Sequence, residues 1–327
     1  MCQTAVFYGE ALAKYGFGSS HPLGTDRLDA FWNKLQSERV RNVVVEEPVM
    51  AGAQAALSFH DTDYVELVKA ASKQGGVLLD SGDTPAFKGA FEASLYVVGS
   101  TLAALDMIVT TKDSRERRVD HAFNAIGGLH HARRDSAGGF CIFNDIGVAI
   151  LAAREKYDIE RIAYVDIDAH HGDGIFYEFE DDPLLFFADI HEDGRHLYPG
   201  TGSASETGKG AAAGAKLNIP LPPGAGDNEF LEAFDKIEQF VHNVEPELII
   251  LQCGADGLAG DPITHLQYTS KAHRFAADSL HKLAHKHCNG RIIVLGGGGY
   301  NRANIGAAWT EVVRSFATNS DFKQEVK

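Results

Sequence analysis

The sequence predicts an α/β fold in which helices cover both faces of a mainly parallel sheet. Two observations lead to this prediction. Short apolar runs of strand length alternate along the chain with amphipathic segments of helix length, which is the order of elements in parallel α/β folds. Several of the apolar runs end directly in acidic residues, histidines or glycines, and functional groups gather at the carboxyl ends of the strands in such folds.

The apolar runs predict about seven or eight strands. The clearest ones span 4–8, 42–46, 161–168, 184–191, 216–221, 248–253 and 292–295. Helical periodicity predicts helices at 28–35, after 60–64, after Pro85, at 145–156, 227–241 and 265–286, and from about 304 onward. A Gly-rich loop is expected over 124–144.

The whole chain, 1–327, is expected to form one domain. Its 327 residues would allow two domains, but no Pro/Ser-rich linker, charge block or low-complexity run divides it. The hydrophobic fraction of 44% and the charged fraction of 23% are those of an ordinary globular protein.

Charge and cysteine usage restrict the partners and the compartment. The net charge of −15 argues against nucleic acid or an anionic membrane as a partner. Cys2, Cys141, Cys253 and Cys288 form no CxxC pair and, without a signal peptide, predict reduced thiols in a cytoplasmic protein. No apolar run approaches the roughly 20 residues of a membrane span.

The stretch 164–174, Tyr-Val-Asp-Ile-Asp-Ala-His-His-Gly-Asp-Gly, carries the strongest functional signal. It starts as a buried strand and then becomes polar. Side chains alternate along a strand, so Asp166, Asp168 and His170 would share one side while the strand geometry lasts. A carboxylate and an imidazole two residues apart at a strand end suit a divalent metal ion. Burying so many ionisable groups without a function would be costly.

Asp168, His170 and Asp256 form the candidate metal-binding set. Three protein ligands leave one coordination position open, as catalytic zinc sites do, whereas structural zinc sites are closed by four ligands. Asp256 follows the predicted strand 248–253, although an aspartate at such a position can also cap a helix.

The adjacent residues His130 and His131 are candidates for acid–base catalysis. An isolated His pair is more often structural. Asp166 and Asp173 favour catalysis, because each could accept the far ring N–H of one of these histidines and raise its basicity.

Tyr300 follows four glycines, 296–299, directly after the last predicted strand. These glycines would bring its hydroxyl close to a reacting carbonyl. The alternative is a tight strand-to-helix turn with a packed tyrosine.

Three other groups of polar residues are interpreted as structural. Asp189 and His191 could form a second metal site, but a structural role beside the first is favoured. His171 is expected to make a structural hydrogen bond. The group His281, His285, His287 and Cys288 resembles metal ligands, and we interpret it as a solvated, partly basic helix end, which the helix dipole favours.

Together these motifs resemble the histone deacetylase superfamily, which includes bacterial acetoin-utilisation proteins and acetylpolyamine amidohydrolases. The resemblance extends from about residue 15 to residue 309. It is carried by segments 21–27, 128–131, 139–145, 166–174, 198–202, 254–256, 260–262 and 295–301. It implies an arginase-like three-layer α/β/α sandwich with an eight-stranded parallel sheet, which agrees with the fold predicted above.

The resemblance also implies catalytic roles. The ligands of Zn2+ (or Fe2+) would be Asp168, His170 and Asp256. His131 would be the general base and later the acid for the leaving amine, while His130 would tune the site electrostatically. Asp166 would pair with His130 and Asp173 with His131. Tyr300 would donate a hydrogen bond to the acyl oxygen.

Substrate contacts follow from the same resemblance. Phe140 and Tyr198 would flank a tunnel for the aliphatic chain of an acyl-lysine, with Gly139 beside Phe140. Asp83 matches a rim acid that holds substrate backbone amides. Arg27 matches a residue at an internal cavity near the acetate product.

A structural potassium site is implied as well. It would be built around Asp166, Asp168, His170, Asp189 and Ile190. Asp189 stands where eukaryotic members commonly have Ser, so this chain departs from their pattern at that position.

The expected function is metal-dependent removal of acyl groups, most simply acetyl, from lysine side chains of a peptide or protein. One alternative is deacetylation of a small amine such as an acetylpolyamine. Ile263 argues against it, because polyamine-selective relatives have an acidic gatekeeper there. A second alternative is a non-catalytic protein that binds acyl-lysine. A homo-oligomer is possible.

Overall fold

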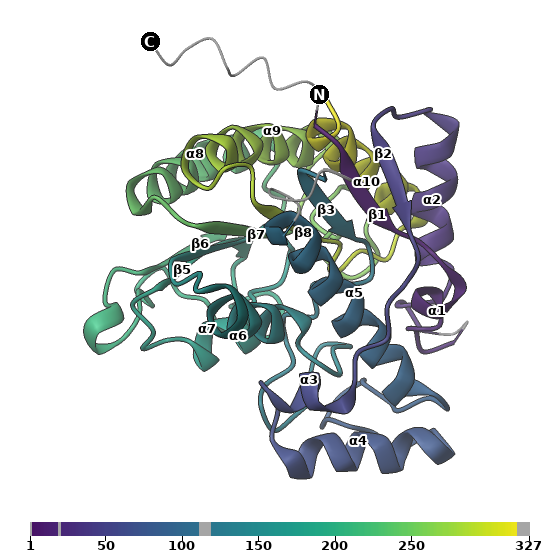
Figure 1. Ribbon diagram of the computed structural model, residues 1–327. Coiled ribbons are helices and arrows are strands. Elements are labelled where there is room, and N and C mark those ends of the chain that lie inside the picture. The colour runs from purple at the N-terminus through teal and green to yellow at the C-terminus, as the bar shows by residue number, and fades with distance from the viewer. Residues whose placement is uncertain (1, 19–20, 111–118, 319–327) are drawn as a thin grey trace.

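The computed structural model describes residues 2–18, 21–110 and 119–318. Its centre is one eight-stranded sheet in the order β2-β1-β3-β8-β7-β4-β5-β6 (Figure 1), and each neighbouring pair is parallel. The strands are β1 Thr4–Phe7, β2 Val43–Glu46, β3 His121–Asn124, β4 Ile162–Asp166, β5 Leu185–Glu192, β6 Lys216–Leu221, β7 Leu248–Gln252 and β8 Ile292–Leu295. The predicted α/β sandwich with a parallel sheet of about eight strands is confirmed.

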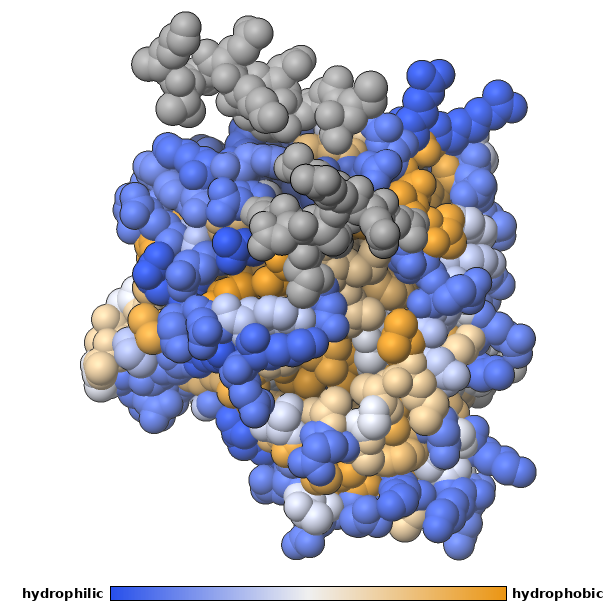
Figure 2. All heavy atoms as spheres, viewed as in Figure 1, coloured by the Kyte–Doolittle hydropathy of each residue, from blue (hydrophilic) through white to orange (hydrophobic). Residues whose placement is uncertain are grey.

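Helices pack on both faces of this sheet. They are α1 Glu10–Ala13, α2 Arg27–Ser37, α3 Ala53–Leu57, α4 Thr62–Gln74, α5 Ala90–Thr110, α6 Asp145–Tyr157, α7 Asp173–Glu178, α8 Asp227–Val244, α9 Ser270–His287 and α10 Arg302–Phe316. Helices α2, α10, α9 and α8 pack side by side in one layer, while α5 and α6 pack together in the other. In Figure 2, hydrophilic side chains dominate the edges of the visible face and apolar ones lie towards its middle.

The central strands are apolar because both of their faces are covered. All residues of β4, β7 and β8 are buried. This explains why these strands appear in the sequence as continuous apolar runs. Each fully buried aliphatic side chain of this kind contributes about 1.5–3 kcal/mol relative to an exposed one.

The strand β3 was not predicted from the sequence. Its four residues, His-Ala-Phe-Asn, begin and end with polar side chains, so they do not form an apolar run. All four are buried, because β3 pairs with β1 on one side and β8 on the other. The short helices α1, α3 and α7 were also missed.

Three predictions about helices need correction. The helix expected over 265–286 begins at Ser270. The helix expected near Pro85 begins at Ala90. The interpretation of the end of α9 as solvated is wrong for His281 and Cys288, which are buried.

The statement that no apolar run reaches the length of a membrane span was also wrong. Within the described residues, one stretch of α5, Ala90–Val109, is long and apolar enough by length and composition. This is weak evidence for a membrane, because α5 packs against β3, β8 and α6 and most of it is buried, as in the core helix of a globular protein.

Candidate active site

The site lies where four neighbouring parallel strands end. His130 and His131 follow β3, Tyr300 follows β8, and Asp256 follows β7. Asp168 and His170 follow β4, next to β5. Residues far apart in the sequence therefore meet at one edge of the sheet, as expected for ligand sites in parallel α/β folds.

Asp168, His170 and Asp256 come together as a possible metal-binding set. The Nδ1 atom of His170 lies 3.1 Å from Asp168 Oδ1 and 3.1 Å from Asp256 Oδ2. One ligand atom from each residue lies within 4.8 Å of the others, and all three residues are buried. Two carboxylates and one imidazole match the donor set of an open catalytic metal site.

Electrostatics in this set favours a bound cation. Burial and the charge of Asp168 raise the pKa of Asp256 to about 7, although His170 opposes the shift. Two carboxylates at this separation repel one another, and a divalent cation between them would remove that penalty. Gly254 and Gly298 provide the space, since a Cβ on either would lie 2.0 or 2.2 Å from an oxygen of Asp168 or Asp256.

Neighbouring groups hold the carboxylates in place. Gln252 donates from Nε2 to Asp168 Oδ2 at 2.7 Å, and the backbone N–H of Gly298 donates to the same oxygen at 2.8 Å. The N–H of Ala169 donates to Asp256 Oδ1 at 2.9 Å. Such outer partners orient metal ligands and tune their affinity.

The two adjacent histidines each face one carboxylate. His130 Nδ1 lies 2.8 Å from Asp166 Oδ2, and His131 Nδ1 lies 2.7 Å from Asp173 Oδ1. The Nε2 atoms of the two histidines lie 3.0 Å apart. The family resemblance implied these pairings, and the structure places both pairs within hydrogen-bond distance.

The two histidines differ in protonation. Burial alone would lower the pKa of His130, but the charges of Asp166 and Asp168 raise it to about 9. Burial and the neighbouring His130 lower the pKa of His131 to about 4, although Asp173 opposes the shift. These opposite shifts favour the protonated form of His130 and the neutral form of His131, and a neutral imidazole can accept a proton.

Sequence reasoning missed two residues that support these pairs. Tyr164, in the middle of β4, donates a short hydrogen bond to Asp166 Oδ2. Arg133 donates to Asp173 Oδ2 at 2.8 Å. Tyr164 appeared to be an ordinary core residue, and only its alternation with Asp166 on the same strand could have indicated the contact.

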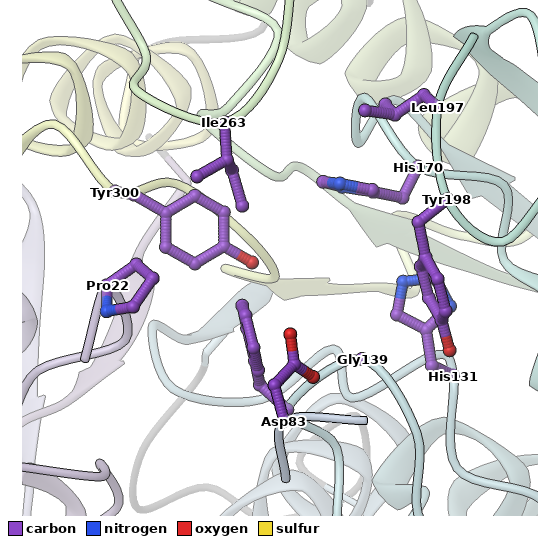
Figure 3. Close-up of a pocket in the computed structure, with 10 residues that line it drawn as sticks. Pro22, Asp83, His131, Gly139, His170, Leu197, Tyr198, Ile263 and Tyr300 are labelled. Carbon is purple, nitrogen blue, oxygen red and sulfur yellow. The ribbon is translucent and has the colours of Figure 1, made fainter. Parts of the chain in front are cut away.

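A cavity of about 280 Å³ opens beside these groups (Figure 3). Its lining residues are Pro22, Asp83, His131, Gly139, Phe140, His170, Leu197, Tyr198, Ile263 and Tyr300. A smaller cavity of about 20 Å³ shares His131, Gly139, His170 and Tyr300 with it and also reaches Asp168 and Cys141.

The Tyr300 hydroxyl points into the larger cavity, towards the side on which His170 and His131 lie (Figure 3). Burial and the charges of Asp256 and Asp168 raise the pKa of Tyr300 well above its usual range. The phenol therefore stays protonated and able to donate. Asp261 fixes the backbone here by accepting the Tyr300 N–H at 2.9 Å.

Aromatic rings form the walls of the cavity. The Phe140 ring lies 5.7 Å from Tyr300, and the Tyr198 ring lies 5.1 Å from His131. Phe140 is buried, whereas Tyr198 is half exposed at the rim. The predicted substrate contacts Gly139, Asp83 and Ile263 also line this cavity.

Arg27 lines neither cavity. It is buried and donates to the backbone carbonyls of Gly299 at 2.9 Å and Gly297 at 2.5 Å. The structure thus gives it a role in holding the glycine turn before Tyr300, and its predicted place near the acetate product stays a prediction.

Asp189 and His191 lie on β5, which pairs with β4 next to the metal-binding set, and His171 follows His170. Asp189 is buried, and its carboxylate accepts the Gly172 N–H at 2.9 Å and lies 2.7 Å from His191 Nδ1. His171 Nδ1 lies 2.8 Å from Thr201 Oγ1, which matches its expected structural role.

Comparison with known proteins agrees with this geometry. The model of the histone deacetylase domain family matches residues 21–316. The chain belongs to the histone deacetylase family. The acetoin utilization protein AcuC of Bacillus subtilis (strain 168) is 36% identical over 326 residues, which cover 97% of this chain and 81% of that protein.

Two further relatives extend the comparison within the histone deacetylase family. A probable deacetylase of Archaeoglobus fulgidus is 32% identical over 303 residues, covering 91% of this chain and 81% of that protein. The crystal structure of the HDA15 HD domain matches with a TM-score of 0.86 at 26% identity, covering 97% of this chain and 88% of that one. Family membership supports a hydrolase with deacetylase activity, in a family that is generally metal-dependent.

Proposed function

We propose that this member of the histone deacetylase family hydrolyses the acyl amide, most simply the acetyl amide, of lysine side chains with a bound Zn2+, or alternatively Fe2+. One observation carries the proposal. The metal-binding set, the His131–Asp173 pair and the Tyr300 hydroxyl all meet beside one cavity of about 280 Å³.

Each residue has a defined task in this proposal. Asp168, His170 and Asp256 would hold the divalent ion, which would lower the pKa of a water molecule and polarise the acyl carbonyl. His131 takes a proton from that water at Nε2 as the new C–O bond forms, while Asp173 holds its Nδ1. His131 then gives the proton to the lysine nitrogen as the C–N bond breaks, so lysine and acetate are released.

Tyr300 and His130 support the same reaction. Tyr300 donates a hydrogen bond to the acyl oxygen as negative charge develops there, and one such donor contributes roughly 100- to 1000-fold in rate. His130, paired with Asp166, places positive charge beside His131 and tunes its basicity.

The cavity supports an extended aliphatic substrate. Phe140 and Tyr198 provide apolar walls for the methylene chain of lysine, and Gly139 leaves room beside them. Asp83 lines the cavity and is exposed to solvent, where it could accept backbone N–H groups of a peptide. Ile263 offers no charge to a polyamine, which favours peptides over acetylpolyamines.

A structural potassium ion belongs to the same proposal. Its surroundings would be Asp166, Asp168, His170, Asp189 and Ile190. Burial and the charge of Asp189 raise the pKa of Asp166 to about 6, although His130 opposes the shift. A monovalent cation near these buried carboxylates would offset their repulsion.

A comparison of substrates tests the proposal. We expect the zinc-loaded protein to release acetate from an acetyl-lysine peptide with a higher kcat/KM than from an acetylpolyamine, and Ile263→Glu to shift the ratio towards the polyamine. His131→Ala should abolish release while its zinc content stays that of the wild type. A protein that binds acyl-lysine but releases no acetate would instead support the non-catalytic alternative.

A further inference from the structure

Four potential metal ligands converge far from the active site. Cys2 lies two residues before β1, His121 opens β3, and His281 and His285 lie one turn apart near the end of α9. One ligand atom from each lies within 4.8 Å of the other three. In Figure 1 the start of β1 lies beside α9 and α10, at the amino ends of the strands, whereas the active site lies at their carboxyl ends.

Three of the six distances between the ligand atoms are close to those around a tetrahedral ion, and the other three lie within 4.8 Å. His281 Nε2 lies 3.1 Å from His121 Nε2 and 3.1 Å from His285 Nε2, and Cys2 Sγ lies 3.4 Å from His285 Nε2. Zinc bonds of 2.0–2.1 Å to nitrogen and 2.3 Å to sulfur place tetrahedral ligand atoms about 3.3 Å (N to N) and about 3.6 Å (N to S) apart.

Hydrogen bonds between the imidazoles do not account for this arrangement. An imidazole nitrogen has either one proton or one in-plane lone pair, so it forms one well-aligned hydrogen bond. His281 Nε2 lies equally close to two other Nε2 atoms. A single metal ion placed between the three imidazoles would be bound by one nitrogen lone pair from each of them.

Most of the cluster is shielded from water. Cys2, His121 and His281 are buried, while His285 is partly exposed and leaves a route for an ion.

We propose that Cys2, His121, His281 and His285 bind a second Zn2+ in a closed structural site. A Cys thiolate with three imidazoles is a four-ligand set of soft and borderline donors, which selects zinc over magnesium or calcium. The site would tie the start of the chain and the first residue of β3 to the end of α9. Its role is to hold the amino edge of the sheet, with no part in the acyl transfer.

Metal content provides the first test. After dialysis against a mild chelator, the wild-type protein should retain about two zinc ions per chain, and His281→Ala about one. Turnover per catalytic zinc should be the same in both, because His281 lies outside the active site. Asp168→Ala, which alters the catalytic set, should retain the zinc that His281→Ala loses.

Cobalt spectroscopy provides the second test and identifies the sulfur ligand. The catalytic set contains no sulfur, so a thiolate-to-cobalt charge-transfer band in the near ultraviolet should come from Cys2 alone. Cys2→Ser is nearly isosteric and should lose this band, whereas Cys288→Ser, which removes another buried thiol just after α9, should keep it. The cobalt spectra of these two cysteine variants test whether Cys2 is a metal ligand even if His281→Ala does not fold.

Two results would overturn the proposal. One is a wild-type protein that retains a single zinc ion per chain and shows no thiolate band after cobalt loading. The other is a band that persists in Cys2→Ser, since the thiolate ligand would then belong to a different site.

Discussion

The glycine before Phe140 provides a sharp test of how closely the active site is packed. Gly139 has φ +50°, and a Cβ added there would lie 2.2 Å from Cδ2 of His131. Carbon atoms in contact are about 3.5 Å apart, so the imidazole would have to move by roughly 1.3 Å. On the other side of the ring, His131 Nδ1 lies 2.7 Å from Asp173 Oδ1, so the movement would disturb this hydrogen bond.

Gly139→Ala should therefore lower kcat/KM for an acetyl-lysine peptide by roughly 100-fold, the usual effect of misplacing a catalytic group by about 1 Å. Gly210→Ala is the matched control. Gly210 has φ +55°, but an added Cβ there would meet no atom within 4 Å. Both variants should lose about 1–2 kcal/mol of stability from the left-handed backbone, and only Gly139→Ala should lose activity.

The measurement is steady-state acetate release, together with metal content and thermal unfolding of both variants. Equal kcat/KM in Gly139→Ala and Gly210→Ala, at equal zinc content, would refute the reasoning, because His131 could then move without consequence.

Three more perturbations follow from the geometry. Tyr300→Phe should reduce kcat by roughly 100- to 1000-fold with unchanged zinc content, and near-wild-type turnover of the loaded variant would exclude its role as the donor. Gln252→Leu removes the 2.7 Å hydrogen bond to Asp168 and should raise the Kd for the catalytic zinc by roughly 10- to 100-fold in a competition titration, whereas an unchanged Kd would contradict the supporting role. Burial lowers the pKa of His60 to about 4, and its Nε2 accepts the Asn144 N–H at 2.8 Å. Between pH 6.5 and about 4 the unfolded state binds more protons at His60, so this residue should make stability fall by up to about 1.4 kcal/mol per pH unit on acidification. His60→Gln should flatten the measured slope over that range, and an unchanged slope would show that His60 is not responsible.

The sequence predicted the parallel sheet and most of the functional side chains at the carboxyl ends of its strands. Buried parallel strands leave continuous apolar runs, and the polar residues that end them, such as Asp168 and Asp256, are visible without a structure. The family resemblance then assigned roles that no single spacing could provide.

What the sequence could not predict depends on contacts between distant elements. Gln252 and Tyr164 belong to buried strands and look like core positions, yet both hold carboxylates of the site. The strand β3 escaped notice because its apolar residues are flanked by His121 and Asn124. For the same reason His121 could not be linked to the histidines of α9, and the end of that helix was interpreted as solvated.

The most direct test of the central claim is acetate release by metal-stripped protein during titration with Zn2+. The proposed mechanism predicts that the stripped protein is inactive towards an acetyl-lysine peptide, that added zinc restores turnover, and that Asp256→Ala is not restored at the same zinc concentration. Wild-type turnover by fully stripped protein, or no acetate release from any acetylated amine at full zinc occupancy, would contradict it.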